Sequence, residues 1–243
     1  MNRRPLVAVA LGLSRRGFVL LGFLAWCAAA AAEPVDLELV LSVDSSGSID
    51  EDEFKLQRLG YARALTDPQV LEAIRSGRHK SIAVTFTEWS GPQIHNRVVR
   101  WTQIATAADA NKFAQALVAA PRKISGGGTS LGGAIDFAAA LFDQNDFEGR
   151  RRVIDISGDG YNNRGQWPDA ARDRALIRRI TINGLPIVDF DDGLEDYFRR
   201  TVIGGSGAFV IVANGFEDFA RAIVRKLILE IYISRRAEAG GQS

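Results

Sequence analysis

The sequence predicts a doubly wound α/β domain with a six-stranded, mostly parallel sheet, one antiparallel edge strand and helices on both faces. Apolar runs of strand length alternate with segments of helical periodicity, an order that is typical of α/β folds. One pair of expected strands is separated only by residues 88–96, which is too short for the crossover of about a dozen residues that a parallel return needs. We therefore expect these two strands to pair antiparallel at an edge of the sheet.

The first strand is expected over residues 37–44, and a loop with oxygen-bearing side chains follows it. Asp44 stands at the end of this strand, and Ser46 and Ser48 come next at alternate positions. Acidic residues then open a helix over residues 51–64, where negative charge suits the helix dipole. Ligands of open α/β sheets bind at the carboxyl ends of the strands, so this loop is a candidate site.

The remaining elements alternate along the chain, and glycine or proline marks several of their boundaries. Further strands are expected over residues 81–87, 97–104, 151–157, 185–190 and 208–213. Further helices are expected over residues 70–74, 107–119, 131–142, 169–180, 194–203 and 216–231. A loose tail is expected from residue 235 onward.

Two later loops bring more oxygen ligands to the same rim of the predicted sheet. The glycine-rich loop 126–130 places Thr129 at the start of a helix, and Asp159 follows a strand between two glycines. Carboxylate and hydroxyl oxygens are hard donors that suit magnesium, calcium or manganese. No histidine or cysteine lies near these motifs in the sequence to favour zinc.

Together these motifs resemble the von Willebrand factor A (vWA) domain and its metal-ion-dependent adhesion site (MIDAS). The pattern comprises Asp-x-Ser-x-Ser from Asp44, a threonine in a glycine loop, and an aspartate before glycine after the fourth strand. The chain is also similar to an uncharacterised bacterial group of exported vWA-like proteins. The resemblance covers most of the chain after residue 35. It implies that Ser46, Ser48 and Thr129 contact a cation with their hydroxyls, directly or through water. Asp44 and Asp159 would act mostly through bound waters and would orient the hydroxyls.

The resemblance implies binding of a protein partner and no bond-making chemistry. Mainly neutral ligands leave the cation incompletely neutralised, so an open coordination position accepts an acidic side chain of the partner. Mg²⁺ is the expected ion, with Ca²⁺ and Mn²⁺ as alternatives. Candidate partner contacts on the same rim are Asn162, Asn163, Arg164 and Asp191. Turn chemistry is the alternative for the first three, and a solvated loop for the last.

Two other interpretations use the same loops. A metal-dependent hydrolase would use the cation to activate water, although the motif loops supply fewer carboxylates than such enzymes usually have. A degenerate vWA scaffold would keep the loops only for stability. His79 and His95 fall in loop-like contexts without a defensible Ser/Asp arrangement, and the dinucleotide and phosphate-loop fingerprints are lacking. We therefore do not expect an enzyme.

Residues 1–32 are expected to be an export signal of the twin-arginine type. A twin arginine at residues 15–16 precedes the apolar run 18–32, and small residues place a cleavage site before Glu33. A general secretory route, an uncleaved membrane anchor and lipidation at Cys27 are the alternatives. Cleavage would leave a periplasmic or secreted protein with no stable membrane span.

The mature chain would comprise a vWA-like domain over residues 33–234 and the tail 235–243. The full sequence has 30 basic and 29 acidic residues, and loss of the four arginines of the signal leaves a net charge of about −3. This balance offers no basic excess for binding nucleic acid. Cys27 is the single cysteine, so the mature chain would have neither a disulfide nor a thiolate metal site. The sequence leaves the oligomeric state and the identity of the partner open.

Overall fold

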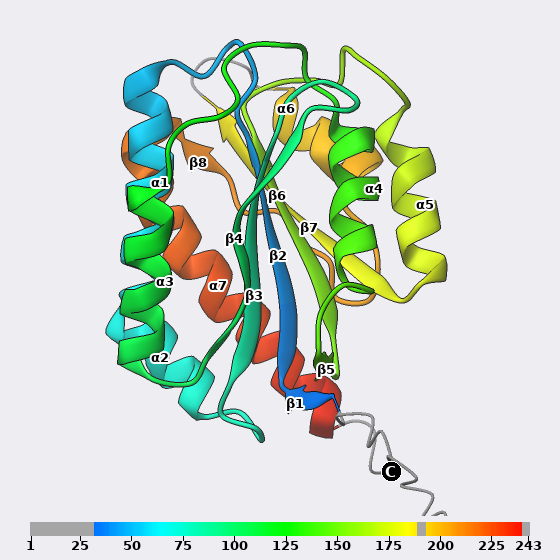
Figure 1. Cartoon of the computed structure of the whole chain (residues 1–243). Coiled ribbons are helices and arrows are strands. Elements are labelled where there is room, and N and C mark those ends of the chain that lie inside the picture. The colour runs from blue at the N-terminus through cyan, green and yellow to red at the C-terminus, as the bar shows by residue number, and fades with distance from the viewer. Residues whose placement is uncertain (1–31, 189–192, 240–243) are drawn as a thin grey trace, which may run out of the picture. The chain divides into compact units, whose positions relative to one another are not determined.

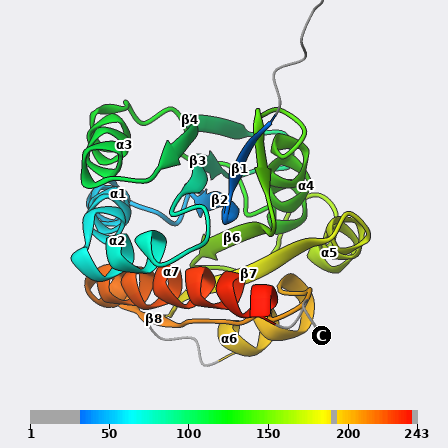
Figure 2. The same ribbon diagram turned by 90° about the horizontal axis from the view of Figure 1, so that it is seen from below.

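The computed structural model describes residues 32–188 and 193–239, and a six-stranded sheet forms its centre (Figures 1 and 2). The strands are β2 (Leu37–Asp44), β3 (Ile82–Trp89), β4 (His95–Ile104), β6 (Arg152–Gly158), β7 (Ile180–Val188) and β8 (Ala213–Asn214). Their order in the sheet is β4-β3-β2-β6-β7-β8. Only β3 and β4 pair antiparallel, and β4 is an edge strand. The predicted fold class is confirmed.

Helices cover both faces of this sheet (Figures 1 and 2). One face carries α1 (Glu51–Thr66), α2 (Pro68–Arg75), α3 (Ala107–Ala119) and α7 (Gly215–Ala239). The other carries α4 (Leu131–Leu141), α5 (Pro168–Ile177), α6 (Leu194–Tyr197) and a π-helical turn, η1 (Phe198–Val202). Each face has its own hydrophobic core.

The central strand β2 contributes to both cores by the alternation of its side chains. Leu37, Leu39 and Leu41 pack with the α1 and α7 face, whereas Val40 packs with the α4 and α5 face. All residues of β2 are buried, as is usual for a strand inside a parallel sheet. The strand therefore ends with Asp44 fully buried at the rim of the sheet.

The fifth strand of the sheet begins earlier than predicted. β7 starts at Ile180, whereas residues 169–180 were expected to be helical and the strand was expected over 185–190. The helix α5 ends at Ile177, and Arg179 then adopts a left-handed backbone with φ of 58°. After this turn the chain enters the sheet at Ile180.

The sixth strand is shorter than expected, and the last helix is longer. Residues 208–213 were predicted to be a strand, but this stretch makes only an isolated bridge between Val210 and Gly184 before β8. The Phe209 N–H donates to the Asn183 side chain at 3.0 Å, so this N–H is not available for a regular ladder of backbone hydrogen bonds with β7. Helix α7 continues to Ala239, so residues 235–239 of the expected tail are helical.

Two short strands were not predicted. β1 (Glu33–Val35) pairs in parallel with β5 (Phe147–Gly149) in a separate two-stranded sheet. Strands of three residues are too short to show a clear period in a sequence.

Several predictions concern residues that the structure leaves out. The export signal lies outside the described residues except for Ala32, and so do Cys27, Asp191 and residues 240–243. Within the described ranges, no helix combines the length and the apolar character needed to cross a membrane.

Candidate metal site

Asp44 is a buried carboxylate with one unsatisfied oxygen. Its Oδ1 accepts a hydrogen bond from the Ser46 N–H at 2.7 Å. Its Oδ2 is buried and has no hydrogen-bond partner among the described residues. Burial and, secondly, the negative charge of Asp159 raise the pKa of Asp44 from 3.8 to about 8. Such a group requires either a proton or a compensating positive charge.

A chain of hydroxyl contacts connects the loop after β2 with Asp159. The Oγ atoms of Ser46 and Ser48 lie 3.1 Å apart, and Ser48 Oγ donates to Asp159 Oδ1 at 3.0 Å. Asp159 directly follows Gly158, the last residue of β6. A Cβ at Gly158 would lie 3.0 Å from Asp44 Oδ2, so the glycine allows these two strand ends to approach closely.

The glycine-rich loop supplies the third part of the site. Gly126 and Gly127 have φ of 98° and 96°, a backbone conformation that glycine adopts readily. The Thr129 N–H donates to Asn163 Oδ1 at 2.9 Å, and the Thr129 carbonyl accepts from the Asn163 N–H at 2.9 Å. These two hydrogen bonds hold Thr129 against the loop that carries Asp159.

The predicted residues meet at one small pocket of about 280 Å³. It is lined by Ser46, Gly47, Ser48, Gly127, Gly128, Thr129, Asp159, Gly160, Tyr161 and Asn163. Asp44 adjoins this pocket through its hydrogen bond to Ser46. The structure thus brings all five predicted ligands together from three loops at the carboxyl end of the sheet.

The donor set fits a hard divalent cation. Two carboxylates and three hydroxyls gather at a pocket whose glycines leave space, and Asp44 Oδ2 lacks a partner in the described structure. The described residues include no group of three or more histidine, cysteine, aspartate or glutamate side chains able to hold a metal. A cation at this pocket would therefore depend on the serine and threonine hydroxyls.

The candidate partner contacts differ in their surroundings. Asn163 holds Thr129, and the Asn162 N–H donates to the Tyr197 hydroxyl at 3.2 Å, so both asparagines support the loop. Arg164 is exposed, and its guanidinium has no hydrogen-bond or ion-pair partner among the described residues. Asp191 lies outside the described residues.

Two aromatic environments near the rim differ from expectation. Trp89 falls within residues 88–96, which were expected to connect two strands of the sheet. It is the last residue of β3, is fully buried, and pairs in register with Asp44. His95, expected in a loop, begins β4 and stacks on Phe137 with ring centroids 4.6 Å apart. Neither residue lines the small pocket.

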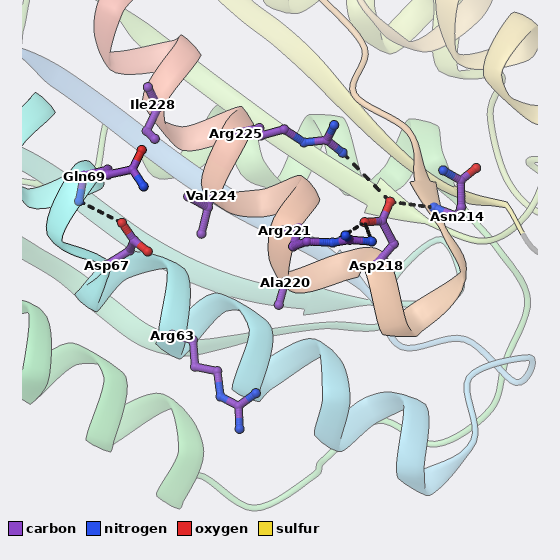
Figure 3. Close-up of a pocket in the computed structure, with 10 residues that line it drawn as sticks. All are labelled: Arg63, Asp67, Gln69, Asn214, Asp218, Ala220, Arg221, Val224, Arg225 and Ile228. Atoms are coloured by element: carbon purple, nitrogen blue, oxygen red, sulfur yellow. Dashed lines mark hydrogen bonds and ion pairs between the residues drawn. The ribbon is translucent and has the colours of Figure 1, made fainter.

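A larger pocket of about 670 Å³ lies between the α1–α2 corner and α7 (Figure 3). None of the predicted ligands lines it. Its Asp218 pairs with Arg221 at 2.8 Å, and its Asp67 accepts from the Gln69 N–H at 2.7 Å. Both of these carboxylates therefore have partners, whereas the smaller pocket adjoins a buried oxygen that has no hydrogen-bond partner in the described structure. The smaller pocket is the candidate site because of this buried oxygen and not because of its volume.

The fold is that of vWA domains, and solved structures with this fold are similar to this chain. The pilus adhesin SpaC from Lactobacillus rhamnosus GG superposes with a TM-score of 0.59 at 17% identity over 82% of this chain. Proximal thread matrix protein 1 (PTMP1) from the mussel byssus superposes with a TM-score of 0.57 at 13% identity over 83% of this chain. The conserved hypothetical protein BatB from Bacteroides thetaiotaomicron superposes with a TM-score of 0.50 at 17% identity over 81% of this chain. The match covers 99% of BatB. The match covers 30% of the SpaC chain and 46% of PTMP1. At these identities the likeness shows the fold alone.

The chain belongs to the family described as "Protein of unknown function (DUF1194)", whose model matches residues 34–235. None of the curated proteins matches the sequence. One further PTMP1 structure has a zinc-occupied MIDAS motif. It superposes with a TM-score of 0.54 at 15% identity, and the match covers 83% of this chain and 49% of that PTMP1 chain.

Proposed function

We propose that this protein is an exported, metal-dependent binding module whose cation accepts an acidic side chain of a protein partner. The observation that carries the proposal is the buried Asp44 Oδ2, which has no partner in the described structure and adjoins a pocket of hydroxyls. The adhesin and byssus proteins with the same fold, one with zinc at its MIDAS, support it.

The cation site in this proposal comprises Asp44, Ser46, Ser48, Thr129 and Asp159. The three hydroxyls contact the cation, directly or through water. The two aspartates orient the hydroxyls and supply negative charge, because Ser46 hydrogen-bonds to Asp44 through its N–H and Ser48 to Asp159 through its hydroxyl. The bound cation supplies the positive charge that attracts a carboxylate. Mg²⁺ is the ion we propose, and Ca²⁺ and Mn²⁺ are the alternatives.

The proposed location is the periplasm or the exterior of the cell. This part of the proposal rests on the twin arginine and apolar run at the start of the sequence. Replacing Arg15 and Arg16 together by lysine would test the export route, because fractionation would then find the protein retained in the cytoplasm. Unchanged export would favour the general secretory route.

Acetate can stand in for the acidic side chain of the partner. We expect acetate to bind the purified protein in Mg²⁺, as seen by nuclear magnetic resonance shifts at the pocket residues, and to bind neither in chelator nor to Asp44→Asn. Asp52→Asn is the matched control, because the Asp52 side chain is 89% exposed on α1. Acetate binding that is equal with and without the cation would contradict the proposal.

A further inference from the structure

We propose that Arg164 is a second anion contact beside the cation, so that the partner presents two neighbouring acidic groups and not one. This inference rests on the proposed function and adds the chemical class of the partner. It depends on three features of Arg164: its anchored backbone, the position of its aliphatic stem, and a guanidinium that has no ion-pair partner among the described residues.

The backbone of Arg164 is fastened to the loop that carries a proposed ligand. The Arg164 N–H donates to the Thr129 carbonyl at 3.2 Å, and the Arg164 carbonyl accepts from Asn162 Nδ2 at 3.2 Å. Because both backbone groups are engaged, the start of the side chain is held at a fixed place next to Thr129.

The stem of Arg164 lies against the wall of the pocket. A Cβ on Gly128 would lie 3.2 Å from Arg164 Cδ and would come closer still to Arg164 Cγ. Gly128 itself lines the pocket. The missing side chain at position 128 therefore leaves the space that the Arg164 stem occupies, and the guanidinium extends from this wall.

The Arg164 guanidinium has no ion-pair partner in the described part of the chain, unlike that of several other arginines. Arg58 pairs with Glu88 at 2.8 Å and Arg174 with Asp136 at 2.7 Å. The Arg164 guanidinium has no such partner among the described residues, and it is exposed. A guanidinium binds a carboxylate through two parallel hydrogen bonds.

A cation in the pocket would place two positive groups on neighbouring walls. Their mutual repulsion is relieved by a ligand that brings one carboxylate to each, whereas a single carboxylate compensates only one of them. A dicarboxylate, or a protein segment with two adjacent acidic residues, is therefore the chemistry that this surface recognises.

The test compares acetate with succinate, glutarate and adipate as probes in Mg²⁺, using pocket resonances to measure each Kd. For wild type we expect a dicarboxylate of suitable length to bind more tightly than acetate. In Arg164→Gln we expect the Kd of acetate divided by the Kd of the dicarboxylate to fall about fivefold, which is typical of a partly exposed charge-assisted contact. The Kd of acetate itself should stay within about twofold of its wild-type value.

Arg63→Gln is the matched control. Arg63 also has an exposed side chain without a partner in the described structure, but it lies in the last turn of α1 and lines the larger pocket (Figure 3). Arg63→Gln should leave the ratio of the acetate Kd to each dicarboxylate Kd unchanged. A dicarboxylate preference that survives Arg164→Gln, or falls equally in Arg63→Gln, overturns the inference while metal-dependent acetate binding still supports the proposed function. If acetate itself fails to bind wild type in Mg²⁺, the proposed function is wrong and this inference fails with it.

Discussion

Asp44 and Gly158 show how closely the two strand ends at the site approach each other. Asp44 is fully buried, and a Cβ on Gly158 would lie 3.0 Å from its Oδ2 and 3.6 Å from Trp89 Cη2. A separation of 3.0 Å is shorter than ordinary van der Waals contact, so the Asp44 carboxylate would have to shift by a few tenths of an ångström. Glycine at position 158 is therefore part of the site although it provides no ligand.

We predict that Gly158→Ala lowers the free energy of unfolding by about 1–3 kcal/mol and weakens cation binding, because the added methyl group displaces the Asp44 carboxylate. Denaturant unfolding and Mg²⁺ titration measure the two effects. Gly160→Ala is the control for the stability measurement, since its Cβ would meet Thr129 Oγ1 at an ordinary 3.8 Å. Equal stability and equal Mg²⁺ affinity for Gly158→Ala and wild type would show that the close approach is unimportant.

At the level of single residues, spacing together with the vWA resemblance predicted which side chains meet at the rim. Asp44, Ser46 and Ser48 alternate within one loop, and Thr129 and Asp159 follow expected element boundaries. The supporting role of Asn163 was missed, because its hydrogen bonds to Thr129 join loops 34 residues apart. Such a contact between loops has no local signal in the sequence.

At the level of elements, buried ionisable and polar side chains attach α7 to the sheet. Lys226 Nζ on α7 lies 2.7 Å from Asp155 Oδ1 on β6 and 2.7 Å from Glu230 Oε1 on its own helix. Asn183 on β7 donates to Glu230 Oε1 at 3.0 Å. These four side chains are fully buried. Lys226 on α7 is thus the partner of the mid-strand residue Asp155.

The pH dependence of stability tests this attachment. Burial raises the pKa of Asp155 from 3.8 to about 7, the Lys226 charge opposes this rise and the Glu230 charge adds to it. The folded protein therefore keeps a proton between about pH 4 and pH 7 that the unfolded chain has lost. The Asp155 contribution must then fall as pH rises through this window and level off above pH 7.

We predict that wild type loses about 2–3 kcal/mol of unfolding free energy relative to Asp155→Asn between pH 5 and pH 8. Asparagine imitates the protonated carboxyl group, so the variant lacks this titration. Chemical denaturation of both proteins at several pH values gives the difference for Asp155 together with its neighbours Lys226 and Glu230, and titrating groups far from Asp155 cancel in the comparison. A difference that stays constant over this range would mean that Asp155 is already ionised at pH 5.

The boundaries of elements were harder to predict than their order. The left-handed turn at Arg179 ends α5 early, and the side chain of Asn183 takes up a backbone donor of the segment before β8. Both effects depend on conformations and contacts that hydrophobic periodicity does not describe.

At the level of the whole molecule, topology follows from the alternation of elements. Short connections exclude most strand orders, and the short gap between β3 and β4 requires an antiparallel pair. The parallel strands β2 and β6 are neighbours, so the loops that follow them meet at one rim. The convergence of Asp44 and Asp159 is thus a consequence of the fold class, which the sequence was sufficient to predict.

The most direct test of the central claim is thermal unfolding of the purified protein in chelator and then in Mg²⁺. A ligand that binds the native state raises stability by RT ln(1 + [L]/Kd). We predict a rise in Tm with Mg²⁺ for wild type and for the exposed-site control Asp52→Ala, and none for Asp44→Ala. An equal rise in wild type and Asp44→Ala, or no rise in wild type well above millimolar Mg²⁺, Ca²⁺ or Mn²⁺, would contradict a cation site at Asp44.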